Sequence, residues 1–113
     1  MYAAVFEMES MFGQFRYICE GETPEAIVAA FECEQSLECL IRHGRCEEGR
    51  DGQLALDRLE AFYNKYMEYK LTMSDIAALD VKINLGTIKC LAVAESAEAI
   101  AALEMQYPEA RRC

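Results

Sequence analysis

Apolar and polar positions alternate in two stretches near the N-terminus. In residues 14–20, the apolar side chains of Phe15, Tyr17 and Cys19 alternate with Gln14, Arg16 and Glu20, which is the period of a half-buried strand. The apolar side chains of residues 2–9 fit either a strand or a helical stripe. We interpret these residues as a first strand that forms a hairpin with the second.

Helical spacing replaces this alternation from Thr23 onward. Thr23 is a favourable N-cap, and Pro24 at the first helical position loses no hydrogen bond that the helix needs. The helix is predicted to run to His43, with Gly44 as its C-terminal stop. Its apolar face consists of Ile27, Ala30, Phe31, Leu37 and Ile41.

Two glutamates interrupt this helical face. Glu34 falls in its middle and Glu38 follows one turn later, and like charges at this spacing destabilise a helix slightly. Either the helix breaks near Gln35 and restarts with Ser36 as its cap, or these carboxylates face something other than a plain core.

A polar loop with several glycines, at residues 44–52, is predicted to lead into a middle helix at residues 53–71, which Asp51 would cap. A short helical turn follows at residues 74–79. The apolar stripe of the middle helix consists of Leu56, Leu59, Phe62, Tyr63, Tyr66 and Met67.

The C-terminal part resembles the beginning of the chain in its pattern. Alternating and continuous apolar positions predict strands at residues 81–85 and 87–94. Ser96 then caps a final helix at about 97–106. We expect the tail, residues 109–113, to be frayed.

One junction occurs twice along the chain. Residues 18–32 (ICEGETPEAIVAAFE) and 91–104 (LAVAESAEAIAALE) each pass from an apolar run through Glu to Thr or Ser, and then into Ala-Ile. This is the pattern of a strand that leads into a capped helix. Internal duplication and chance recurrence both explain it.

The order of these elements predicts an α+β fold. We expect a small antiparallel sheet with about three helices packed on one face, in the order ββα-α-ββα. A chain of 113 residues is long enough for one hydrophobic core and too short for two, so residues 1–113 should form a single globular domain.

Composition and charge argue against several classes of protein. Apolar residues make up 53% and charged residues 27% of the chain, which is typical of a folded soluble protein. No apolar run has the length of a membrane span, and the N-terminus lacks the basic region of a signal peptide. The net charge of −9 argues against direct binding of nucleic acid, because Lys and Arg supply most of that affinity. We therefore expect a cytoplasmic protein that contacts neither nucleic acid nor membrane.

Acidic residues are concentrated between Tyr17 and Ile41, where six Glu occur without any Lys or Arg. A solvated acidic face is one explanation, and a docking surface for a protein with a basic surface is the other. The expected partner-binding residues are Glu25, Glu32, Glu34 and Glu38.

The chain has six cysteines and no CxxC pair. Because no secretion signal is visible, we expect reduced thiols, most of them small core residues. Cys39, His43 and Cys46 form a candidate zinc set, since Cys39 and His43 lie one helical turn apart and thiolates and imidazole both bind zinc. A fourth ligand would come from Glu47, Glu48 or another cysteine.

Aromatic and Met residues recur at helical spacing in the middle helix. They supply more apolar surface than one helix usually buries in so small a domain, so we expect a two-fold homodimer through this helix. The alternative is a small-molecule site on the same stripe. The expected interface residues are Phe62, Tyr63, Tyr66, Met67 and Tyr69.

These features favour a non-enzymatic binding or regulatory protein. The chain contains no nucleotide-binding, metalloprotease or nucleophile-elbow motif, and His43 is its single histidine. The leading hypothesis is an inhibitor that docks on the basic, nucleic-acid-binding surface of a partner, such as a phage or mobile-element protein that counters host defence. The alternatives are a small-molecule- or metal-binding domain and an enzyme that uses a thiol or a carboxylate.

Overall fold

The computed structural model describes all 113 residues. They form one five-stranded sheet and five helices, which confirms the α+β class with more helices than predicted. None of these helices combines the length and the apolar character needed to cross a lipid bilayer. The elements are β1 (Tyr2–Ser10), β2 (Gly13–Gly21), α1 (Pro24–Glu34), α2 (Leu37–Glu47), α3 (Arg50–Met67), α4 (Met73–Ala77), β3 (Asp80–Ile83), β4 (Gly86–Ala94), α5 (Ala97–Gln106) and β5 (Arg111–Arg112).

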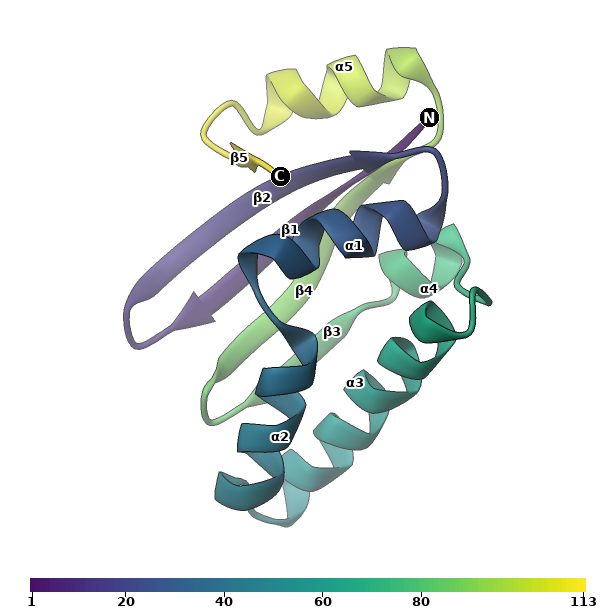
Figure 1. Ribbon diagram of the computed structural model, residues 1–113. Helices are drawn as coiled ribbons and strands as arrows, with labels where there is room; N and C mark the ends of the chain where they lie inside the picture. Colours follow the sequence, from purple (N-terminus) through teal and green to yellow (C-terminus); the bar gives the residue numbers. More distant parts are fainter.

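The strands lie in the order β3-β4-β1-β2-β5, so the N-terminal strand is at the centre of the sheet (Figure 1). β1 pairs antiparallel with β2 on one side, with Val5 opposite Ile18, and antiparallel with β4 on the other. The interpretation of residues 2–9 as a strand is therefore confirmed. Only the short pairing of β2 with β5 is parallel.

Alternate residues of β1 belong to two separate cores. Phe6 packs on Phe31 of α1, with ring centroids 4.5 Å apart, in the larger core under α1 to α4. Val5 faces the other way and packs in a smaller core with α5. Figure 1 shows α5 on the opposite side of the sheet from the other four helices. The prediction of helices on one face is wrong, because the run Ala3–Phe6 is apolar on both sides and requires cover on both.

The repeated junction occupies one end of the sheet. The Thr23 hydroxyl accepts a hydrogen bond from the Ala26 N–H at 3.1 Å, and the Ser96 hydroxyl accepts one from the Ala99 N–H at 3.1 Å, so both predicted caps are confirmed. β2 and β4 run in the same direction, since both are antiparallel to β1. They lead into α1 and α5 on opposite faces. The two junctions are thus related by an approximate two-fold axis parallel to β1, which exchanges β2 with β4 and α1 with α5.

The long N-terminal helix of the prediction is in fact two helices. α1 ends at Glu34, and Ser36 caps α2 by accepting a hydrogen bond from the Cys39 N–H at 3.2 Å. The Glu32 carboxylate reaches across the break and accepts the Leu37 N–H at 2.8 Å. The broken helix is therefore the one of the two alternatives that the structure adopts.

Gly44 does not end α2, as the sequence had suggested. It is buried in the helix against Leu56 of α3, where a Cβ atom would collide with the Leu56 side chain. The predicted loop at residues 44–52 shrinks to residues 48–49. The Gln53 side-chain amide donates to three backbone carbonyls at the end of α2, at 3.1–3.2 Å, and so satisfies groups that a helix end leaves unpaired.

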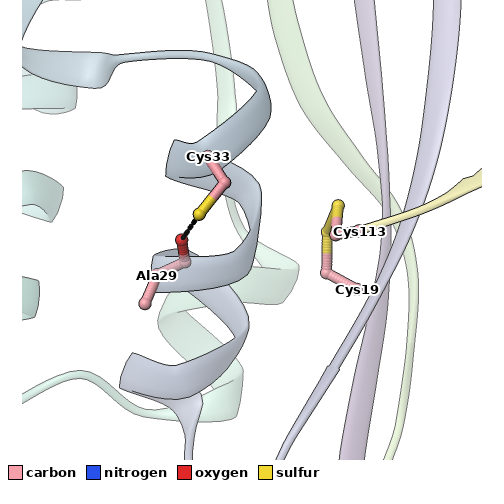
Figure 2. Close-up of a disulfide and its surroundings, with 4 residues drawn as sticks. All are labelled: Cys19, Ala29, Cys33 and Cys113. Atoms are coloured by element: carbon pink, nitrogen blue, oxygen red, sulfur yellow. Dashed lines mark hydrogen bonds between the residues drawn. A yellow bond between two sulfur atoms is a disulfide. The ribbon is translucent and has the colours of Figure 1, made fainter.

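The C-terminal tail is tied to β2 and is not frayed. The Cys113 N–H donates a hydrogen bond to the Ile18 carbonyl oxygen at 3.1 Å. A disulfide joins Cys113 to Cys19 (Figure 2). The Arg112 guanidinium also pairs with Glu104 of α5, with 2.8 Å between Nη2 and Oε2. The tail therefore closes the edge of the sheet beside β2.

The cysteines differ from their prediction as core thiols. Four of them are free, as expected, but Cys33, Cys39 and Cys46 are exposed on the outer faces of α1 and α2. Cys90 in β4 is only half-buried, and the fully buried Cys19 is in the disulfide. Figure 2 shows Cys33 on α1, apart from that disulfide.

Candidate protein-binding surface

One acidic residue of α1 and two aromatic residues of α3 and its C-terminal end meet in one groove. A cavity of about 440 Å³ lies there, lined by Glu25 from α1 and by Tyr66 and Tyr69 from α3 and its C-terminal end. The negative charge of Glu32 raises the pKa of Tyr63 and Tyr66, but neither Glu32 nor Tyr63 lines this cavity. Two sets of residues that are far apart in the sequence therefore form one surface. We call it the acidic–aromatic groove; its members are Thr23, Glu25, Ala26, Ala29, Tyr66, Met67 and Tyr69.

Small side chains on α1 leave room for this groove. Ala26 and Ala29 lie about one turn apart and both line the cavity. Cys33, one turn further on, is exposed, and its thiol donates a hydrogen bond to the Ala29 carbonyl oxygen at 3.5 Å (Figure 2). Because these side chains are short, they leave Tyr66 accessible.

Two of the four expected partner-binding glutamates also hold the fold together. Glu25 accepts a hydrogen bond from the Leu71 N–H at 2.8 Å and so fixes the segment after α3 to the start of α1. Glu32 accepts the Leu37 N–H at the break between α1 and α2. Burial raises the pKa of Glu32, the hydrogen bond from Leu37 opposes this shift, and the charge of Glu38 adds to it.

The other two expected partner-binding residues point outward. Glu34 is exposed at the end of α1. Glu38 is exposed on α2 and pairs with Arg42, with 2.9 Å between its Oε1 and the arginine Nη2. An exposed pair of this kind contributes little to stability, on the order of 0.5 kcal/mol. Both residues can therefore be changed without loss of the fold.

Tyr63 and Tyr66 form an aromatic pair beside Glu32. Their ring centroids are 5.9 Å apart and the rings are tilted by 51°. Burial raises the pKa of both hydroxyls, and the negative charge of Glu32 raises it further. Both hydroxyls are consequently neutral at physiological pH, with their rings next to a carboxylate.

Tyr69 has an unusual backbone conformation. Its φ of 57° lies in the left-handed region, where glycine is preferred. Its N–H donates to the Tyr66 carbonyl oxygen at 3.2 Å, and the Lys70 N–H donates to the Lys65 carbonyl oxygen at 2.9 Å, which is the Schellman arrangement that ends α3. The ring is 82% exposed, so nothing inside the protein explains a tyrosine at this position.

Of the five expected dimer-interface residues, Phe62 lies in the larger core and is only 7% exposed. It belongs to the inner stripe of α3 together with Leu59, and this fold leaves it unavailable for an interface. Tyr63 and Tyr66 are half-buried at the edge of this core, and Met67 is more than half exposed. Helical spacing identified the stripe but did not separate its inner residues from its outer ones.

The structure does not bring Cys39, His43 and Cys46 together as a metal site. Cys39 and His43 line a second groove, and Cys46 does not. No group of three or more His, Cys, Asp or Glu side chains is arranged to hold a metal ion.

This second groove is an apolar surface that the sequence analysis missed. Its cavity of about 450 Å³ lies between α2 and the tips of the two hairpins, and we call it the tip groove. Phe12 is 83% exposed at the turn between β1 and β2. An apolar Met-Phe pair in a turn, where Gly, Asn, Asp or Ser is usual, was a visible signal for it. The lining residues are Met8, Ser10, Phe12, Phe15, Tyr17, Gln35, Cys39, Leu40, His43 and Leu85.

The chemistry of the acidic–aromatic groove suits the binding of cations. Carboxylates and the faces of aromatic rings both attract positive charge.

The half-buried Cys90 thiol lies outside this groove. Burial raises its pKa to about 11, which keeps the thiol protonated at neutral pH.

No protein-family model matches this chain, and no curated protein or solved structure is detectably similar to it.

Proposed function

We propose that this protein is a non-enzymatic regulator, which docks its acidic–aromatic groove on the basic surface of a partner protein. The observation that carries the proposal is the meeting of the Glu25 carboxylate of α1 with the rings of Tyr66 and Tyr69 in one groove. Where the partner uses that basic surface to bind nucleic acid, docking excludes the phosphates and the protein acts as an inhibitor.

The two kinds of side chain in the groove have complementary roles in binding. Tyr and Met are enriched in the cores of protein interfaces, because they bury a large area at a small entropic cost. The carboxylates add attraction for Lys and Arg and speed the encounter with a basic partner. Glu34 and Glu38, exposed beside this region, extend the negative field around the break between α1 and α2.

A second copy of the chain fits this groove less well than a basic partner does. A two-fold interface places the same patch of each copy against itself. Glu25 of one copy would then approach Glu25 of the other, in a chain whose net charge is −9. Such an interface carries like-charge repulsion that a basic partner avoids.

The test measures the affinity for the partner as a function of charge. The partner is captured from cells, identified by mass spectrometry and purified, and the Kd is measured at increasing salt. We expect the Kd to rise with salt, and the Glu34→Lys/Glu38→Lys variant to bind about tenfold more weakly. Nucleic acid should compete with this protein for a partner that binds it.

A matched control separates the local charge beside the groove from the overall charge. The Glu9→Lys/Glu98→Lys variant raises the net charge by the same amount, but its two substitutions lie on the α5 side of the sheet. It should bind almost as the wild type does. Equal weakening by both variants, or an unchanged Kd for the first variant with an intact circular dichroism spectrum, would overturn the proposal.

A further inference from the structure

We infer that the acidic–aromatic groove seats one arginine side chain of the partner, with its guanidinium between the Glu25 carboxylate and the rings of Tyr66 and Tyr69. The inference rests on the proposed function and names the chemical group that this groove recognises.

The Glu25 carboxylate is held in place, and only one of its two oxygens accepts a hydrogen bond from the chain. It is the single charged side chain that lines the cavity. Oε2 accepts the Leu71 N–H at 2.8 Å, while Oε1 forms no hydrogen bond within the chain. No Lys or Arg of the chain pairs with this carboxylate. Glu25 also lies in the first turn of α1, where the helix dipole stabilises its negative charge. The groove thus presents a held anion without a counter-ion.

Two rings accompany this carboxylate. Tyr66 comes from the last turn of α3, and Tyr69 follows the end of that helix. The left-handed backbone of Tyr69 holds a ring at a position where glycine would end the helix with less strain. A cation over the face of a Tyr ring is attracted by the ring's electrons. A carboxylate and two rings in one cavity therefore provide both kinds of contact that a bound cation uses.

Arginine fits this combination better than the other candidate groups. A purely apolar side chain would leave the Glu25 carboxylate desolvated and unpaired, and an anion would be repelled by it. A lysine ammonium is a compact, strongly hydrated point charge. A guanidinium is planar, so it stacks on a Tyr ring while it donates hydrogen bonds to a carboxylate in its own plane.

A direct test uses short peptides as the probe. Acetyl-Gly-Arg-Gly-amide is titrated into ¹⁵N-labelled protein, and a second titration uses the same peptide with citrulline, the uncharged isostere of arginine. We expect saturable shifts of the amide signals of Ala26, Ala29, Tyr66 and Tyr69 with the arginine peptide. Binding of the citrulline peptide should be at least about tenfold weaker.

Two variants locate the site. Glu25→Gln keeps an oxygen that can accept the Leu71 N–H, so the fold is retained while the charge is lost. It should weaken arginine binding about tenfold. Tyr69→Gly relieves the backbone and removes one ring, and it should weaken binding several-fold. Glu98→Gln, also in the first turn of a helix but on the other side of the sheet, is the matched control and should leave binding unchanged.

The outcomes separate this inference from the proposed function. Absence of saturation with the arginine peptide, equal binding of the citrulline peptide, or shifts that map outside the groove would each overturn the arginine site. If Glu34→Lys/Glu38→Lys weakens partner binding while Glu25→Gln does not, the docking proposal holds and the arginine site fails. If the arginine peptide binds but that double variant leaves the partner's Kd unchanged, the docking proposal fails and the arginine site stands.

Discussion

The left-handed backbone conformation of Tyr69 lowers the stability of the fold by an amount that a single substitution can measure. A non-glycine residue in the left-handed region costs about 1–2 kcal/mol, and glycine loses about 0.5–1 kcal/mol through its greater freedom in the unfolded chain. Because the ring is almost fully exposed, its removal sacrifices little packing. We expect Tyr69→Gly to raise the free energy of unfolding by up to about 1 kcal/mol. Urea denaturation checks this, with Tyr69→Ala as a control that keeps the strain and should show no gain.

The two cap hydroxyls provide the second residue-scale prediction. Thr23 and Ser96 each accept an N–H that would otherwise lack a partner. Thr23→Ala and Ser96→Ala should each lower the free energy of unfolding by about 1 kcal/mol in chemical denaturation. Ser74→Ala is a suitable control, since Thr72 and not Ser74 caps α4. An unchanged midpoint for either cap variant would contradict the role assigned to that hydroxyl.

At the scale of elements, α4 depends on an ionised carboxylate. Asp75 accepts hydrogen bonds from the Thr72 N–H at 3.0 Å and from the Lys65 ammonium at 3.0 Å. Burial raises the pKa of Asp75, but these hydrogen bonds and the Lys65 charge outweigh it and hold the pKa below its usual value. The stability that Asp75 contributes is therefore present above the unfolded pKa of about 3.9 and is lost as the pH falls through the lower folded value.

The lowered pKa of Asp75 gives a pH-dependent prediction for the stability of α4. Asp75→Asn should lower the free energy of unfolding by about 1 kcal/mol at pH 7. The difference from the wild type should shrink below about pH 4, where the wild-type carboxyl also becomes protonated. Urea denaturation at a series of pH values measures it. A difference that stays constant down to the acid limit would exclude ionisation of Asp75 as the cause.

The elements that the sequence predicted well have local causes. The caps at Thr23 and Ser96 and the strand period of β2 depend on residues only a few positions apart, and the break at Ser36, which the sequence left as one of two alternatives, is also capped locally. The prediction that Gly44 ends the helix was wrong. A glycine near a helix end usually stops the helix, whereas here the Leu56 side chain occupies the space that a Cβ atom at position 44 would need. That requirement arises only when α2 and α3 are packed together.

The candidate groove likewise combines features that were visible in the sequence with features that only the packing of the helices determines. Both the acidic run and the aromatic stripe were visible in the sequence, but neither pattern says that α1 and α3 lie side by side. The inner position of Phe62 and the tie between Glu25 and Leu71 also depend on this packing. The pairing of Cys113 with Cys19 spans most of the chain, so no local signal could distinguish it from two free thiols.

On the scale of the whole molecule, the disulfide closes a loop with a sequence separation of 94 residues. Cross-linking so long a loop restricts the unfolded chain, and such disulfides typically contribute about 2–4 kcal/mol. Cys113→Ser should lower the free energy of unfolding by that amount without reductant, and by little with reductant present. Cys46→Ser, which removes an exposed free thiol, is the control. Equal stability of wild type and Cys113→Ser without reductant would refute the bond's contribution.

The tip groove determines what we expect of self-association. No carboxylate lines it, so two copies of this acidic chain can meet there without the repulsion expected at the acidic–aromatic groove. We expect wild type to exceed the monomer mass of 12.8 kDa in light scattering at micromolar concentration, and Phe12→Gln to restore that mass. Met67→Gln should have no such effect. A monomeric wild type, or loss of association only in Met67→Gln, would contradict this assignment.

The central position of β1 has a consequence for the order in which the chain is made. β1 is synthesised before β2 and β4 and can pair with β2 first, but its other edge is closed only by β4, which begins at Gly86. Until β4 is made, the apolar run Ala3–Phe6 therefore has an unpaired edge, a state prone to intermolecular strand pairing. A fragment that ends before Gly86 should therefore aggregate more readily than a chain that contains β4.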